Sequence, residues 1–168
     1  MPQAEMYKVG TMGAGFLAVM ACPTIDAAEP ASIANIAKLG IKLVVSLLEP
    51  GEARTLGLEG ERLEVKAHGM EFVSFPIPDM GLPASVLDFT SLTKSLFAQV
   101  NAGSNTLLHC RAGIGRSGLL AAGVLLHAGM NAEEAFAYVS KMRGIRVPET
   151  PDQHDWLVAN YPVIVSQR

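Results

Sequence analysis

The chain has 168 residues, of which 49% are apolar and 17% are charged. This length suits one domain with a packed core, so we expect a single domain over residues 1–168 and exclude a disordered chain or a coiled coil. Asp and Glu number 16 and Lys and Arg 13, which gives a net charge of -3. That charge is not typical of proteins that bind nucleic acid or an anionic membrane surface. The 2 cysteines are too few for a disulfide framework.

The first predicted elements lie in an uncharged stretch between Lys8 and Asp26. It is shorter than the roughly twenty strongly apolar residues of a membrane-spanning helix, and it lacks the basic start of a signal peptide. Glycine-broken buried strands are the interpretation that we favour, so no membrane partner is expected. A helix is predicted next, over Glu29 to Leu39, with Gly40 as its stop.

The chain then alternates between strands and helices. Leu43 to Leu48 is a continuous apolar run typical of a strand buried on both faces. Residues 71–77 form a second such strand, which Pro76 and Pro78 end because proline lacks the N–H that the sheet needs. A long helix is predicted from Pro83 to about Asn101.

The remaining elements continue this alternation. Thr106 to Cys110 is a third buried strand, and a glycine-rich turn separates it from an apolar helix over about Ser117 to His127. Asn131 caps a further helix, and Thr150, followed by a proline, begins the last one. Strands alternating with helices predict an α/β fold with a mostly parallel central sheet flanked by helices on both faces.

The candidate chemistry lies in HCRAGIGRSG, His109 to Gly118, between the third strand and its helix. Where a strand ends opposite a helix N-terminus, an open α/β sheet binds anions. The glycines of this segment let the backbone curl, so that successive N–H groups point inward. The residues expected to bind a phosphate are Arg111, Ala112, Gly113, Ile114, Gly115 and Arg116.

Three side chains of this segment fit nucleophilic catalysis. The helix dipole and the loop N–H groups favour a thiolate at Cys110. The planar guanidinium of Arg116 can hold two phosphate oxygens, and Ser117 can donate its hydroxyl to the sulfur as a thiolate departs. The segment therefore predicts a cysteine that attacks phosphorus. The alternative, a buried structural cysteine, leaves the arginine and the glycines unexplained.

The same segment resembles the signature loop of the cysteine-dependent protein tyrosine phosphatases. The short chain and the Ala112-Gly113 pair resemble the dual-specificity branch, over about residues 40 to 160. The resemblance implies that family's fold, a phosphocysteine at Cys110, and no metal or organic cofactor. It also implies that His109 orients the loop and favours the thiolate, without acting as a base. A satisfied histidine at the end of a strand is compatible with that role.

The family also uses a general acid on a mobile loop ahead of the signature. In FPIPDMGLP, Asp79 lies 31 residues before Cys110, as that family's aspartate is placed. It would protonate the leaving oxygen and later activate water; an ordinary turn aspartate is the alternative. Asp88 falls inside a predicted helix and is expected to face solvent. Met80, beside Asp79, is a candidate substrate contact.

A third segment, VPETPDQHDWL, resembles the family's segment in which a glutamine positions water. Gln153 is the matching residue, and Glu149 stands where some members carry another glutamine, which puts water positioning in doubt. If Thr150 is the N-cap, Gln153 falls three residues on and completes a capping box instead. Both roles stay open at this point.

The second cysteine and the other histidines have weaker signals. Cys22 is a candidate partner for a disulfide with Cys110 on oxidation, which requires that the two lie close together. His68, His127 and His154 lack metal-ligand spacing, so no metal site is expected.

These patterns predict a phosphatase that acts on phosphorylated proteins or peptides, at phosphotyrosine and also at phosphoserine or phosphothreonine. The alternatives are a rhodanese-like sulfurtransferase, which would require neither Asp79 nor Ser117, a catalytically dead phosphate-binding module, and a phosphatase of a non-protein phosphomonoester. The signature segment lacks the extra lysines of phosphoinositide-specific members. We expect a cytoplasmic monomer, because a reducing compartment keeps the thiolate usable.

Overall fold

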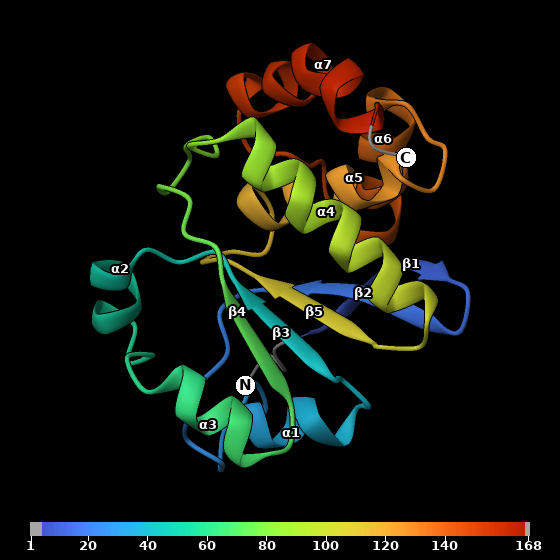
Figure 1. Ribbon diagram of the computed structural model, residues 1–168. Coiled ribbons are helices and arrows are strands. Elements are labelled where there is room, and N and C mark those ends of the chain that lie inside the picture. The colour runs from blue at the N-terminus through green and yellow to red at the C-terminus, as the bar shows by residue number, and fades with distance from the viewer. Residues whose placement is uncertain (1–4, 167–168) are drawn as a thin grey trace.

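The computed structural model describes residues 5–166 and has a five-stranded sheet at its centre (Figure 1). The strands, in the spatial order β1-β2-β5-β3-β4, are β1 (Tyr7–Met12), β2 (Gly15–Met20), β5 (Thr106–His109), β3 (Leu43–Ser46) and β4 (Glu71–Ser74). β1 pairs antiparallel with β2, whereas the other neighbouring strands are parallel. The prediction of a mostly parallel sheet is therefore confirmed, as are the strands near the N-terminus.

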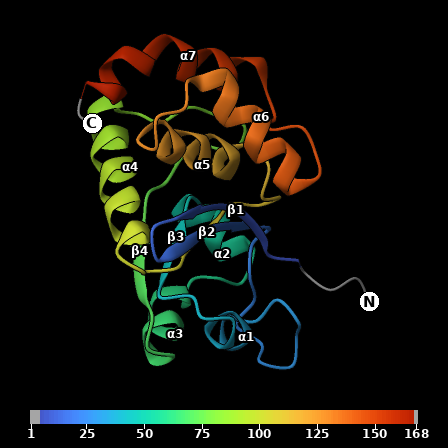
Figure 2. The same ribbon diagram turned by 90° about the vertical axis from the view of Figure 1, so that its right-hand side faces the viewer.

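Helices cover both faces of this sheet, as the two perpendicular views show (Figures 1 and 2). One face carries α4 (Val86–Asn101), α5 (Arg116–Leu126), α6 (Ala132–Arg143) and α7 (Pro151–Val165). The other face carries α1 (Ile33–Lys38) and α3 (Glu61–Ala67), while α2 (Pro50–Thr55) lies beyond the end of β3. Within residues 5–166 no helix has both the length and the apolar character needed to cross a membrane.

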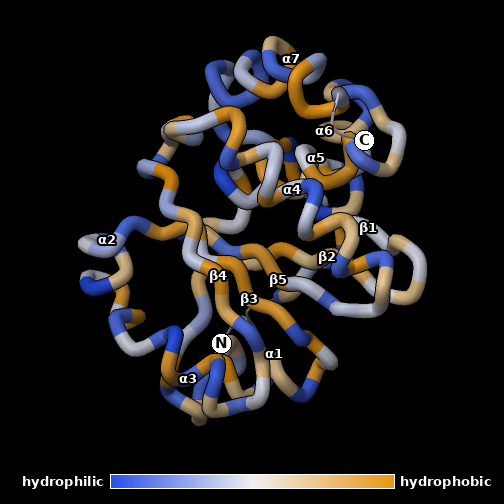
Figure 3. Tube along the Cα trace, in the orientation of Figure 1, coloured by the Kyte–Doolittle hydropathy of each residue, from blue (hydrophilic) through white to orange (hydrophobic). Residues whose placement is uncertain are grey.

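The central strands are buried on both sides. Every residue of β3 and β5 is buried, and Figure 3 shows them as apolar segments in the middle of the molecule. One hydrophobic core lies between the sheet and α4 to α7, and a second packs residues such as Ile33, Ile36 and Val65 against the opposite face. Such strands need no polar alternation, which is why they read as continuous apolar runs.

Two helices differ from the sequence prediction. Residues 49–52 predict only the end of a strand, yet α2 begins at Pro50, and α3 follows where no element is predicted. These helices have six and seven residues, too short to be stable without tertiary packing.

The boundaries of three elements also differ from the sequence prediction. Ser32 and Ser85 cap α1 and α4 by accepting backbone N–H bonds, so both helices begin three or four residues later than predicted. The strand predicted over residues 71–77 ends at Ser74. The elements themselves agree with the predicted alternation.

Candidate active site

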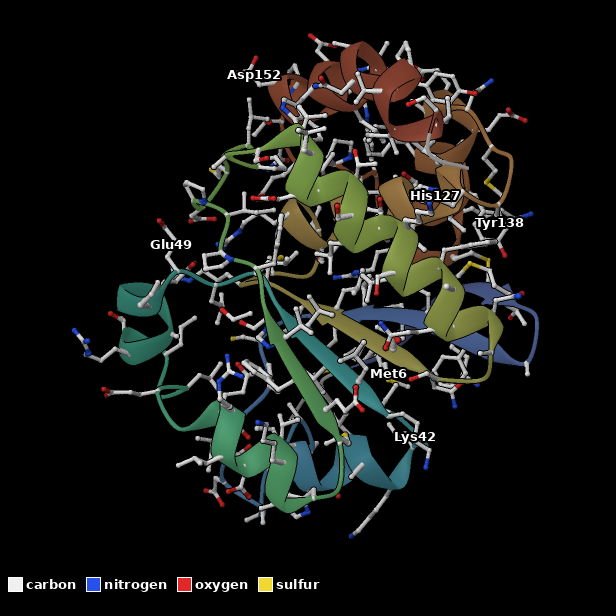
Figure 4. The ribbon with its side chains drawn as sticks, viewed as in Figure 1. Met6, Lys42, Glu49, His127, Tyr138 and Asp152 are labelled. Atoms are coloured by element: carbon white, nitrogen blue, oxygen red, sulfur yellow. The ribbon has the colours of Figure 1, made fainter. Side chains whose placement is uncertain are left out.

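The predicted signature segment lies at the carboxyl ends of the parallel strands. Residues 110–115, which we call the signature loop, connect the end of β5 to the start of α5. Figure 4 labels Lys42 and Glu49, which precede and follow β3 and lie at opposite ends of the sheet. The signature loop is at the Glu49 end, because Ser46 of β3 pairs with His109 of β5. This edge is where parallel sheets bind their ligands.

Close packing requires glycine at two positions of the signature loop. Gly113 has a φ of +71°, and a Cβ there would lie 2.5 Å from the carbonyl carbon of Met20. A Cβ at Gly115 would lie 2.9 Å from Cβ of Glu149 and 3.1 Å from Oε1 of Gln153. The loop is therefore confined between the end of β2 and the start of α7, and its curl depends on glycine.

Cys110 begins the signature loop and is only 2% exposed. Its Sγ lies 3.3 Å from Oγ of Ser117, which is buried in the first turn of α5. Arg143 of α6 contacts the loop as well: its Nε donates to the Gly113 carbonyl at 2.9 Å, and its guanidinium lies 4.0 Å from the Tyr7 ring centroid. Nothing in the local sequence pattern distinguishes Arg143.

The other predicted phosphate-binding residues lie along the same loop. Arg111 and Ala112 are exposed, whereas Ile114 packs partly against the core and lines a groove of about 530 Å³ with residues 145–151. The backbone N–H of Cys22 donates to the Arg111 carbonyl at 3.2 Å, so this cysteine lies beside the loop. Burial raises the pKa of the Cys22 thiol, and the Arg111 charge opposes that effect. The disulfide with the signature cysteine stays a prediction.

His109 forms a buried pair with a carboxylate that no sequence pattern indicates. Its Nε2 lies 2.5 Å from Oε2 of Glu61, and the two side chains are 0% and 3% exposed. The other ring nitrogen, Nδ1, lies 3.5 Å from the Cys110 carbonyl oxygen. The pair holds the imidazole in one orientation directly before the signature loop. Glu61 belongs to α3, which is itself unpredicted, and lies 48 residues away in sequence.

Arg116 is 2% exposed and is surrounded by acceptors. Nη1 and Nη2 donate to the two carboxylate oxygens of Glu52 at 2.7 and 2.8 Å. Nη1 also donates to the Ile77 carbonyl at 2.9 Å, and Nη2 to Oδ1 of Asp79 at 3.1 Å. Nε has no hydrogen-bond partner among residues 5–166. The structure thus brings two sequence-predicted site residues, Arg116 and Asp79, into direct contact.

Glu52 is the second carboxylate that sequence reasoning missed. The hydrogen bond from Arg116 holds the pKa of Glu52 below its usual value, against burial, which raises it. Glu52 therefore stays ionised as a fixed counter-ion to the guanidinium. A signal existed, because a proline at the first position and an acid three residues after Glu49 are typical of a helix start.

Asp79 lies on the segment between β4 and α4, residues 75–85, which we call the acid loop. Its side chain is 50% exposed. A turn follows in which the Gly81 N–H donates to the Pro78 carbonyl at 2.7 Å, and Met80 adopts a φ of +57°. No other non-glycine residue in the described range 5–166 has a positive φ. Asp88 is exposed on α4, so the expectation that it faces solvent is confirmed.

Gln153 is fully buried at the start of α7. Thr150 caps this helix and forms a capping box with Gln153, which confirms the structural role considered above. The same side chain also reaches the acid loop, where Nε2 donates to the Gly81 carbonyl at 3.1 Å. In the part of the chain that the structure describes, no three His, Cys, Asp or Glu residues are grouped so as to hold a metal ion.

Comparisons with known proteins find similarity to phosphatases. A family model described as "Tc-R-P: Polymorphic toxin system, DSP-PTPase phosphatase" matches residues 18–130. Human protein tyrosine phosphatase type IVA 3 is 29% identical over 113 residues, which cover 66% of this chain and 60% of that protein. A phosphatidylglycerophosphate phosphatase of Arabidopsis thaliana is 30% identical over 112 residues, 66% of this chain and 47% of the relative. The chain thus spans less than two thirds of the length of either relative.

Solved structures share the fold over nearly the whole chain. A kinase associated phosphatase with its catalytic-site cysteine replaced by serine superposes with a TM-score of 0.83 at 20% identity, and covers 100% of this chain and 99% of its own. The active form of a phosphatase named Tk-PTP gives a TM-score of 0.75 at 24% identity, over 97% of both chains. The predicted tyrosine phosphatase-like fold is therefore confirmed.

Proposed function

The chain belongs to the Tc-R-P family of DSP-PTPase phosphatases, and from this premise we propose that it hydrolyses phosphate monoesters through a phosphocysteine intermediate at Cys110. The observation that carries the proposal is the 3.1 Å contact between Arg116 and Asp79. It joins the expected phosphate-binding arginine to the expected general acid, 37 residues away in sequence. We assign residues 1–168 to one phosphatase domain.

In the first step, the Cys110 thiolate attacks phosphorus from the base of the signature loop. An S–P bond forms while the P–O bond to the leaving group breaks, and Asp79 donates its proton to the departing oxygen. Charge on the remaining phosphate oxygens would be held by the N–H groups of the signature loop, the N-terminus of α5 and Arg116.

The contacts of Arg116 specify how it would hold the phosphate. Glu52 engages both terminal nitrogens from one side, so the guanidinium is oriented before substrate binds. Nε is open and Nη2 carries Asp79. A phosphate could accept one hydrogen bond from Nε and a second from Nη2, in the place that Asp79 now occupies. This would be the expected two-point contact. Asp79 would then move from the arginine to the leaving oxygen.

In the second step, water attacks the phosphocysteine. Asp79, now a carboxylate, accepts a proton from the water; the new P–O bond forms and the S–P bond breaks. The Ser117 hydroxyl, 3.3 Å from Sγ, would donate to the departing thiolate. His109, held by Glu61, would keep the start of the signature loop in place. This reaction uses no metal or organic cofactor.

We propose phosphorylated proteins or peptides as substrates, including phosphotyrosine. The signature loop has no lysine to bind a polyanionic headgroup. A non-protein phosphomonoester is the second candidate, supported by the similarity to a phosphatidylglycerophosphate phosphatase and by the exposed apolar residues Met80 and Leu82 on the acid loop. A sulfurtransferase is not favoured, since the matched family consists of phosphatases. We also propose that the protein is a monomer and that it is cytoplasmic. The compartment follows from the nucleophile, because a thiolate needs a reducing environment.

Hydrolysis of para-nitrophenyl phosphate by the wild type, Cys110→Ser and Asp79→Ala tests the proposal. The wild type should turn over, and the serine variant should not. A wild type that is inert while it transfers sulfur from thiosulfate would prove the proposal wrong. Parallel assays with phosphotyrosine peptides, phosphoserine peptides and phosphatidylglycerophosphate then separate the two substrate classes.

A further inference from the structure

We infer that Gln153 is a positioning residue for the general acid: its buried amide holds the acid loop against the signature loop. This inference rests on the proposed phosphatase reaction, in which Asp79 donates the proton. It replaces the water-positioning role that the family resemblance suggests for this glutamine. It also goes beyond the capping of α7, which uses only part of the side chain.

The amide of Gln153 makes hydrogen bonds with three backbone groups on two separate segments. Oε1 accepts from the N–H groups of Glu149 at 3.1 Å and Thr150 at 3.3 Å, and Nε2 donates to the Gly81 carbonyl at 3.1 Å. The orientation of the amide is unambiguous, because two N–H donors face one end and a carbonyl faces the other. Both lone pairs of Oε1 are used, so this oxygen has no capacity left to accept a hydrogen bond from an attacking water.

The contact with Gly81 lies two residues from Asp79. The turn between them is closed by the hydrogen bond from Gly81 to Pro78, and Met80 is held in the left-handed region at its centre. The hydrogen bond between Gly81 and Pro78 ties the two ends of this turn together, so an anchor at Gly81 fixes the position of the turn that contains Asp79. Holding this carbonyl therefore limits where the Asp79 carboxyl can lie.

The opposite side of Gln153 faces the signature loop. A Cβ at Gly115 would lie 3.1 Å from Oε1 of Gln153, so no gap separates the amide from the loop that holds the nucleophile. The side chain is 0% exposed, which excludes solvent from this contact. One residue thus sets the spacing between the two loops that supply the nucleophile and the acid.

The test separates the Gly81 contact from helix capping. Gln153→Glu keeps both acceptors of the capping box, which tolerates glutamate at this position, and in its ionised form it loses the donor to Gly81. The matched control is Thr150→Val, which removes the other half of the capping box and leaves the Gly81 contact intact. Two substrates are compared: phenyl phosphate, whose leaving group needs the acid, and an aryl phosphate with a strongly acidic phenol, which does not.

We expect Gln153→Glu to lower kcat/KM for phenyl phosphate about tenfold to a hundredfold, while the activated ester changes by less than about threefold. Thr150→Val should lower Tm and leave both rates within about twofold of the wild type. In an Asp79→Ala background, Gln153→Glu should cause no further loss, because two residues that act as a unit are not additive.

Other outcomes overturn the inference. Equal losses on both substrates, with phosphocysteine accumulating, would identify Gln153 as a water-positioning residue. If Gln153→Glu has the same rates as the wild type, Gln153 serves only to cap α7. Should this variant fail to fold, Gln153→Met, which is uncharged and of similar length, undergoes the same comparison. A wild type that hydrolyses no phosphate ester is a separate result, because it overturns the proposed function and this inference with it.

Discussion

The signature loop and the acid loop meet at the candidate active site, but different interactions hold them. The signature loop connects β5, which is entirely buried, to α5, whose residues are all buried. On the acid loop, the side chains of Asp79 and Met80 are about half exposed. That exposed part reaches the site through hydrogen bonds with the side chains of Arg116 and Gln153.

This difference indicates how each loop responds to substitution. The nucleophile is placed by core packing, which is stiff because interiors are close-packed. The acid is placed by a few polar contacts that can be broken without unfolding the chain. Changes at the signature loop and its partners should therefore affect stability together with activity, whereas changes on the acid loop should act mainly on rate.

The largest effect is expected at the nucleophile. Cys110→Ser should lower kcat by about ten-thousandfold or more, because a serine hydroxyl is not ionised near neutral pH. Phosphate affinity should persist, since Arg116 and the loop N–H groups remain. Para-nitrophenyl phosphate turnover and calorimetric titration with phosphate measure both quantities. Cys22→Ser is the control and should keep its activity within about twofold. Loss of phosphate binding in Cys110→Ser would contradict a loop held by the core.

Asp79→Asn should act on rate alone. The amide cannot donate a proton as a carboxyl does, so kcat for phenyl phosphate should fall about a hundredfold. Inorganic phosphate should bind more tightly, because the variant removes a negative charge that occupies Nη2 of Arg116. Tm should stay near that of the wild type, as the side chain is 50% exposed. Weaker phosphate binding, or a large fall in Tm, would contradict the contrast between the loops.

Glu52→Gln should affect stability, because Glu52 binds Arg116, which directly follows the signature loop. The substitution removes the charge of the carboxylate that binds a buried guanidinium, at a cost of about 2 kcal/mol in the free energy of unfolding, as for other hydrogen bonds between charged groups. The pKa of Glu52 is lowered by Arg116, so its contribution is present above the unfolded value of about 4.3 and is lost as pH falls through the lower folded value.

The Tm difference between wild type and Glu52→Gln tests the direction of this pH dependence. It should be constant from about pH 7 to 5.5 and narrow as pH falls below about 4.3. Glu64→Gln is a matched control on α3, where the carboxylate faces His68 near the surface. A difference that grows toward acidic pH would be inconsistent with a lowered pKa.

The smallest effect is expected at Met80. Its left-handed backbone costs a non-glycine residue about 1 kcal/mol, but glycine adds a similar entropic cost. Met80→Gly should thus change the free energy of unfolding by less than about 1 kcal/mol, and Met80→Ala, which keeps the strain but avoids the entropic cost, should have a similar stability. If the side chain contacts substrate, KM for aryl phosphates should rise in both variants. An unchanged KM would remove Met80 from the substrate contacts.

The elements that could be predicted are those with a local signal. Residues close together in sequence determine the apolar runs of β3 and β5, the glycine-rich turn and the capping box at Thr150. The helices α2 and α3 were not predictable, because six or seven residues do not form a stable helix alone. They form where the fold packs them, and each carries a carboxylate of the candidate site.

The sequence by itself determined the likeness to cysteine phosphatases, since Cys110, Arg116 and Ser117 lie within one short segment whose chemistry is local. Only the tertiary structure decided the partners of these residues. Glu52 lies 64 residues from Arg116, and Glu61 lies 48 from His109. The contact between Gln153 and Gly81 spans 72 residues. Hydrogen bonds over such separations depend on how sheet and helices pack, and no local pattern encodes that packing.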